Sequence, residues 1–113
     1  MKTTGDEIIA NQSTDSITIN SMGFRGTEFS EVKPPSAYRI FMVGGSTMFG
    51  AGATSDQTTI PGYMQEIFNG KDFDFDIQVI NSGIQGADTN TELNLIEQKL
   101  LAFSPDLLIM YYG

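Results

Sequence analysis

The chain has 113 residues, the usual size of one domain, and its 14 acidic and 6 basic residues give a formal net charge of −8. This charge repels phosphate backbones and anionic lipid, so we expect no nucleic-acid partner. The sequence contains no cysteine and no histidine, which excludes thiol chemistry, disulfides and an imidazole base from within this chain. No stretch approaches the roughly 18 apolar residues of a membrane span, and the first residues lack the apolar run of a signal peptide.

The first 35 residues predict an N-terminal arm. Residues 1–16 are polar and without periodicity, which indicates a loose segment, and Ile17 and Ile19 then alternate with polar residues as in a short strand. A GFRG turn at residues 23–26 follows, and two prolines at 34 and 35 mark a linker. Within that turn, we expect Arg25 to clamp the arm against a sheet; reaching a functional site is the alternative.

Residues 36–113 predict the main unit, with three apolar runs at 40–43, 77–80 and 107–112. The first run is continuous rather than alternating, which is typical of a parallel strand covered on both faces. Two helical patterns separate them, so the order strand, helix, strand, helix, strand predicts an α/β fold with right-handed crossovers. Because the last strand reaches the end of the sequence, we expect these residues to be the front part of a larger domain, or a second copy to pair with the open strand edge.

Both helical patterns carry end signals. In the first, Thr59 is the expected N-cap, Pro61 lies in the first turn and Gly70 ends the helix. In the second, Thr89 and Glu92 match a capping box, so the helix is expected to begin near residue 90. The expected apolar faces are Ile60, Met64, Ile67 and Phe68 in the first helix, and Leu93, Ile96, Leu100 and Leu101 in the second.

Glycine-rich loops follow the first two strands of the main unit. In open α/β sheets, sites form at the carboxyl ends of the strands. We therefore expect three features to converge there: Ser46 after the first strand, the turn from Gly83 to Gly86 after the second, and whatever follows Gly113 after the third.

Three interpretations of Ser46 stay open from the residues alone. It can be a turn residue that caps backbone N–H groups, or part of a hydroxyl-rich phosphate loop of the flavodoxin kind. A Walker-type loop is disfavoured because Ala51 and Gly52 stand where lysine and serine or threonine are required. A nucleophile needs a hydroxyl, a base and oxyanion donors, and the N–H groups of Ser46 and Gly86 could supply only the last. The spacing also excludes the GxSxG elbow of α/β-hydrolases.

Four segments in order resemble the front portion of SGNH hydrolases, also called GDSL-type esterases and lipases. The first family block, a Gly-Asp-Ser-like turn, matches Gly44 to Thr47 with Gly45 in place of the aspartate, and the second block matches Asn81 to Gly86. Gly113 matches the start of the third block, so the resemblance covers residues 17–113. The segments are INSMGFRG, KPPSAYRIFMVGGSTMFGAG, VINSGIQGADT and SPDLLIMYYG.

The resemblance implies a flavodoxin-like three-layer αβα fold with a parallel sheet, present here as its first three strands and two helices. It implies that Ser46 attacks an acyl carbonyl and that the N–H groups of Ser46 and Gly86 receive the oxyanion. The family's asparagine of the third block and its histidine base do not occur in this sequence, so we expect the chain alone to be inactive. We expect the intact protein to hydrolyse or transfer small-molecule or carbohydrate acyl esters, without a cofactor or metal. The alternative is a non-catalytic flavodoxin-like module that binds a phosphate-bearing ligand.

Overall fold

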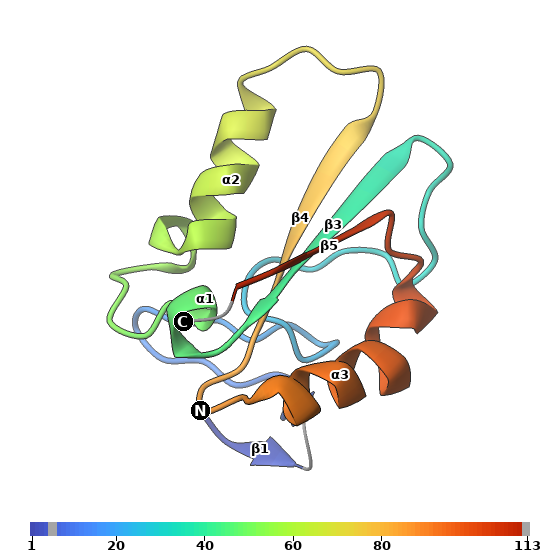
Figure 1. The fold of residues 1–113 in the computed structure, drawn as a ribbon. Helices are drawn as coiled ribbons and strands as arrows, with labels where there is room; N and C mark the ends of the chain where they lie inside the picture. The colour runs from blue at the N-terminus through green and yellow to red at the C-terminus, as the bar shows by residue number, and fades with distance from the viewer. Residues whose placement is uncertain (5–6, 112–113) are drawn as a thin grey trace.

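The computed structural model describes residues 1–4 and 7–111. A parallel three-stranded sheet lies at the centre, in the order β4-β3-β5, with β3 (Ala37–Gly44) between β4 (Asp76–Gly83) and β5 (Leu107–Met110). Figure 1 shows α2 (Ile60–Asn69) and α3 (Thr89–Gln98) on opposite sides of this sheet, and the short α1 (Ser46–Phe49) at the end of β3. The predicted α/β class with parallel strands is confirmed.

The central strand β3 contributes to an apolar cluster on each face of the sheet. Phe41 and Val43 face α3 and join the larger cluster, whereas Ile40 and Met42 face α2. All four side chains are buried. The continuous apolar run at these positions therefore has the cause expected from the sequence, since both of its faces are covered.

The helix α2 begins and ends where the sequence predicts, but its buried face differs. The N–H of Gly62 donates to the Thr59 hydroxyl over 3.1 Å, which confirms the cap. Met64 and Phe68 pack on the sheet as predicted. Ile60 and Ile67, however, are 39% and 53% exposed, so half of the predicted apolar face is wrong.

The reason lies in Gln65, whose side chain faces β4. Its amide oxygen accepts from the Val79 N–H over 2.7 Å, and its amide nitrogen donates to the Ile77 carbonyl over 2.9 Å. This pair of bonds has the pattern that one residue of a neighbouring parallel strand would make. Gln65 thus covers part of the outer edge of β4 and fixes the rotation of α2.

The helix α3 is capped one residue earlier than predicted. The Asp88 side chain accepts from the Thr91 N–H over 2.9 Å, so the expected capping box of Thr89 and Glu92 is wrong and Glu92 is buried instead. After Gln98 the chain tightens into the 3₁₀ turn η2 (Leu100–Phe103), which changes the direction of the following side chains. Leu100 is buried and Ile96 packs against the core as predicted. Leu93 and Leu101, however, are exposed, and Leu95 is buried instead, so half of this predicted face is wrong.

The N-terminal arm is not loose. Two short antiparallel strands, β1 (Thr3–Thr4) and β2 (Glu7–Ile8), lie within the first residues, and Ile8 is buried in the core. The strand predicted around Ile17 and Ile19 is wrong, because this segment makes only isolated bridges, one of them between Ile19 and Arg25. Ile19 nevertheless packs in the main cluster, so residues 1–35 contribute to the core.

Two further predictions concern the end of the chain. The third strand begins at Leu107 as predicted and extends to Met110, while Tyr112 and Gly113 lie outside the described residues. Within residues 1–4 and 7–111, no helix is both long enough and apolar enough to cross a membrane.

Candidate active site

Ser46 is the first residue of α1 and is exposed at the carboxyl end of the central strand. Gly45 stands at the N-cap, so α1 begins without a side-chain cap. The sequence predicted a turn here, and the structure forms one turn of helix instead. Under the turn interpretation Ser46 would cap backbone N–H groups, but it is the first helical residue and no side chain caps α1.

Gly86 lies in the turn that follows β4. The Ala87 N–H donates to the Ile84 carbonyl over 3.1 Å and closes a four-residue turn. Gly86 occupies the third position with a φ of +78°, which is the left-handed conformation that a type II turn requires. The Gly86 N–H takes no part in the closing bond, and the residue is exposed.

The loops that carry Ser46 and Gly86 adjoin at one edge of the sheet. Gly44 pairs with Gly83 in the parallel register, and the Ile84 N–H donates to the Gly44 carbonyl over 3.0 Å. A Cβ on Gly45 would lie 3.6 Å from the Ala87 carbonyl oxygen, so a side chain at position 45 would be in van der Waals contact with the second loop. The expected third contribution, from whatever follows Gly113, lies outside the 113 residues of the sequence.

The short helix α1 rests directly on the backbone of β4. A Cβ on Gly83 would lie 2.2 Å from the Phe49 backbone nitrogen, a distance that no side chain tolerates. Met48 and Phe49 point inward and are buried. Glycine at position 83 is therefore the condition for placing α1 over the sheet.

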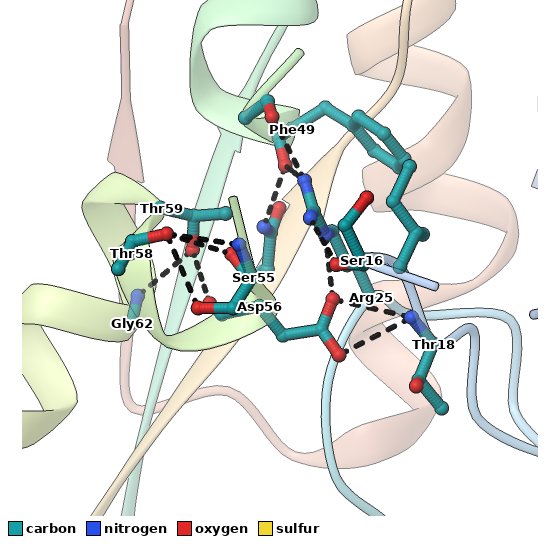
Figure 2. Close-up of polar contacts among 12 residues, drawn as sticks. Ser16, Thr18, Arg25, Phe49, Ser55, Asp56, Thr58, Thr59 and Gly62 are labelled. Atoms are coloured by element: carbon teal, nitrogen blue, oxygen red, sulfur yellow. Dashed lines mark hydrogen bonds and ion pairs between the residues drawn. The ribbon is translucent and has the colours of Figure 1, made fainter. Parts of the chain in front are cut away.

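Arg25 holds the other end of α1, as Figure 2 shows. One of its terminal nitrogens, Nη1, donates to the carbonyls of Phe49 and Gly50 over 3.0 and 2.9 Å, and its Nε pairs with Asp56 over 2.7 Å. The Nη2 donates to Ser16 over 2.9 Å, and the guanidinium lies 5.1 Å from the centre of the Phe49 ring. Arg25 is thus a structural clamp as predicted, but its side chain holds the arm to α1 and to Asp56 rather than to the sheet.

Two further residues belong to this network, and the sequence analysis did not predict that they support α1. Asn81, buried on β4, donates from its side-chain amide to the Phe49 carbonyl over 3.1 Å and accepts from the Gly83 N–H over 3.0 Å. Asp56, in the 3₁₀ turn η1 (Asp56–Thr58), binds Arg25 and also accepts from the Thr18 N–H. The only signal for Asp56 is its place just before the Thr59 cap, and nothing in sequence spacing links it to an arginine 31 residues earlier.

The acidic groups closest in sequence to Gly86 are Asp88, which caps α3, and Glu92, which is buried. Hydrogen bonds from Thr91 lower the pKa of Asp88, which serves as the cap of α3. Burial, followed by the charge of Asp88, raises the pKa of Glu92. Among the residues that the structure describes, no cluster of three histidine, cysteine, aspartate or glutamate side chains could hold a metal ion.

Two grooves, each of about 280 Å³, follow the outer edge of β4. Neither groove is lined by Ser46 or Gly86. The two grooves adjoin, and both are lined by Arg25, Gly26, Thr27, Gln65, Val79 and Asn81. The loops of the candidate site are thus separate from these hollows.

Comparison of the chain with protein-family models gives no match, and comparison with curated proteins gives none either. The functional assignment therefore depends on the residues and on their geometry.

Proposed function

We propose that this chain is the front part of an SGNH-type serine esterase or acyltransferase, with Ser46 as its nucleophile. The observation that carries the proposal is the position of Ser46: an exposed hydroxyl on the first residue of a helix, immediately after the central strand. The adjoining turn holds Gly86 in the left-handed conformation, with its N–H outside the closing hydrogen bond.

The proposed reaction begins when the Ser46 Oγ attacks the carbonyl carbon of an acyl ester and its proton passes to a base. The N–H groups of Ser46 and Gly86 then donate to the oxyanion of the tetrahedral intermediate. Collapse releases the alcohol, which takes up the proton, and leaves an acyl-serine. Water completes hydrolysis of this intermediate, whereas a second hydroxyl completes acyl transfer; carbohydrate esters are substrates that fit either outcome.

In an SGNH-type enzyme the base is a histidine, and because the sequence has none, we propose that the base comes from outside the 113 residues. Loss of the base of a catalytic triad lowers turnover by up to about 10⁶. We therefore expect the 113-residue chain alone to be inactive.

The strand order supports a flavodoxin-like, three-layer arrangement as part of the proposal. The first strand of the parallel sheet, β3, lies between the second, β4, and the third, β5. This is the beginning of the order 2-1-3-4-5, in which ligands bind where the connections diverge to the two sides of the first strand. Ser46 follows that first strand.

The test uses the complete product of the gene, with p-nitrophenyl acetate as substrate. We expect turnover that Ser46→Ala abolishes, and covalent labelling of Ser46 by a fluorophosphonate. The 113-residue chain serves as a comparison and should show only background hydrolysis. Equal turnover in the parent protein and in Ser46→Ala, together with no labelling, would refute the proposal.

A phosphate-binding module is the second candidate, and one observation favours it. The hydroxyls of Ser46 and Thr47 are both exposed at the start of α1, where no side chain caps the helix. The net charge of −8 opposes an anionic ligand. Titration with flavin mononucleotide and with inorganic phosphate decides between them: saturable binding without Ser46-dependent turnover would favour this module over the esterase.

Self-association is a further proposal, made through the outer edge of β5. This strand pairs only with β3 among the described strands. Leu107 at its start and Tyr111, the residue after its end, are 42% and 46% exposed. For the 113-residue chain by itself, we expect a second copy to pair along this edge, which in the parent protein the proposed fourth strand would occupy instead. Light scattering across a concentration series measures it, and a constant monomer mass would contradict it.

A further inference from the structure

We infer that Arg25 and Asn81 are positioning residues for Ser46, which act by holding the carbonyl end of α1. The inference rests on the proposed function, because it assigns these residues a part in the reaction of Ser46. It extends that function to side chains that lie outside the proposed reacting groups and that come from the N-terminal arm and from β4.

The helix α1 cannot define its own geometry. It has only four residues, from Ser46 to Phe49, and one turn of helix is unstable without tertiary contacts. It ends at Gly50, whose φ of +95° reverses the chain. The N–H groups of Gly50 and Ala51 donate back to the Ser46 carbonyl over 2.9 and 3.0 Å, so the backbone of Ser46 is bonded to this reversal.

Arg25 and Asn81 donate hydrogen bonds to the carbonyl groups of the same chain reversal. The Phe49 carbonyl accepts from both side chains, and the Gly50 carbonyl accepts from Arg25. A short chain of bonds thus leads from Arg25 to the Gly50 carbonyl, and from the Gly50 N–H to the Ser46 carbonyl. Both side chains are buried, so water does not compete for these carbonyls.

Arg25 is itself fixed in place. Asp56 binds its Nε, the Ser16 carbonyl accepts from its Nη2, and the Phe49 ring lies against its guanidinium. The Thr18 N–H in turn donates to both oxygens of Asp56 over 3.2 Å (Figure 2). A planar group with donors on three nitrogens satisfies this arrangement, and a lysine ammonium in the same place could not reach all of the acceptors.

The consequence concerns the distance between the nucleophile and Gly86. Ser46 belongs to α1, whereas Gly86 belongs to a turn anchored on β4, so a shift of α1 changes their separation. A misplacement of about 1 Å at a reacting group can lower a rate by about 10². Because Arg25 and Asn81 bind carbonyls of α1, they oppose such a shift of Ser46.

The experiment compares Arg25→Lys and Asn81→Ala with Arg39→Lys in the complete gene product. Arg39 is a matched control, because it is also a buried arginine that lies 5.0 Å from a phenylalanine ring, at the opposite end of the sheet. Kcat, KM, the rate of fluorophosphonate labelling at Ser46 and the Tm are measured for each, at a temperature where all are folded.

We expect Arg25→Lys to lower kcat by about 100-fold and Asn81→Ala by about tenfold, with KM within about twofold of the parent. Labelling of Ser46 should slow in parallel. Arg39→Lys should lower the Tm and leave kcat within about twofold. If Arg25→Lys does not fold, Asn81→Ala carries the test.

The inference is overturned if Arg25→Lys and Asn81→Ala keep the kcat of the parent protein, or if Arg39→Lys lowers kcat as much as they do. If Ser46→Ala has at the same time lost all turnover, the proposed function is left intact. Turnover that survives Ser46→Ala refutes the proposed function instead.

Discussion

The two ends of the sheet are each held by one buried arginine, and the two arginines bind differently. At the carboxyl end, Arg25 pairs with the Asp56 carboxylate and binds carbonyls of α1. At the amino end, the guanidinium of Arg39 binds neutral acceptors: the side-chain oxygen of Gln78 and the carbonyls of Ser30, Glu31 and Phe103. Burial lowers the pKa of Arg39, and the charge of Asp106 offsets part of this effect.

The difference teaches that the same side chain serves two purposes in this fold. Arg39 joins the N-terminal arm to η2 at the end remote from Ser46, so it contributes to stability. Arg25 joins the arm to the helix of the proposed nucleophile, so it contributes to stability and to geometry. Substitutions at the two ends should therefore separate stability from turnover.

Replacement of Arg39 by methionine should have the largest effect on stability. The change leaves the Phe103 and Glu31 carbonyls and Gln78 without their donor, and each buried acceptor left unpaired costs about 1–3 kcal/mol. We expect the free energy of unfolding to fall by about 3–5 kcal/mol. Urea denaturation of the 113-residue chain measures it, and a loss below about 1 kcal/mol would show that water replaces these bonds.

The ion pairs at the two ends should differ in strength. Asp56→Asn leaves the fully buried Arg25 cation without a counter-charge, and we expect a loss of about 2–3 kcal/mol. The matched control is Asp106→Asn at the amino end, since Asp106 and Lys33 are each about a quarter exposed. Exposed pairs contribute about 0.2–1 kcal/mol. Equal losses from the two substitutions would contradict the comparison.

The sheet was predictable from the sequence because its signals are local. Short apolar runs identify β3, β4 and β5, and a proline and a threonine mark the start of α2. The helix faces were less predictable, since periodicity alone does not show that Gln65 turns toward β4 or that η2 interrupts the helical phase after Gln98.

The candidate site was predictable only in its loops. Topology places Ser46 and Gly86 on neighbouring strand ends, and the register of Gly44 with Gly83 agrees with this. The support beneath the site depends on contacts between residues far apart in sequence, such as Arg25 with Phe49 and Asp56. No pattern within a window of sequence encodes those contacts.

Two glycines with similar left-handed backbone conformations sharpen the assignment of the carboxyl end. Gly86 and Gly52 have φ values of +78° and +83°, and a Cβ on either would meet no atom within 4 Å. Alanine at each position should therefore cost about 1–2 kcal/mol through strain alone. Only Gly86→Ala should also lower kcat in the complete gene product, because strain at position 86 would displace the N–H that is proposed to donate to the oxyanion. Equal kcat values in the two variants would remove Gly86 from the proposed site.

Substitution of Glu92 has the smallest expected effect on the free energy of unfolding. Glu92 is a buried acidic group, in contrast to the two buried arginines. Unlike Arg25 and Arg39, its Oε2 has no hydrogen-bond partner among the residues that the structure describes. Burial and the charge of Asp88 raise its pKa, so the native state binds this proton more tightly than the unfolded chain does. Its contribution to stability is therefore favourable at low pH and is lost as pH rises from the ordinary glutamate pKa through the raised one.

Glu92→Gln should accordingly stabilise the protein at pH 7 by on the order of 1 kcal/mol, and the gain should disappear below about pH 4. Asp88→Asn is the matched control of opposite sign, because hydrogen bonds lower the pKa of Asp88 and its contribution is lost as pH falls. Urea denaturation across pH 3.5 to about 8 measures both. A gain from Glu92→Gln that persists at the acidic end would mean that side-chain packing, rather than the charge, destabilises this position.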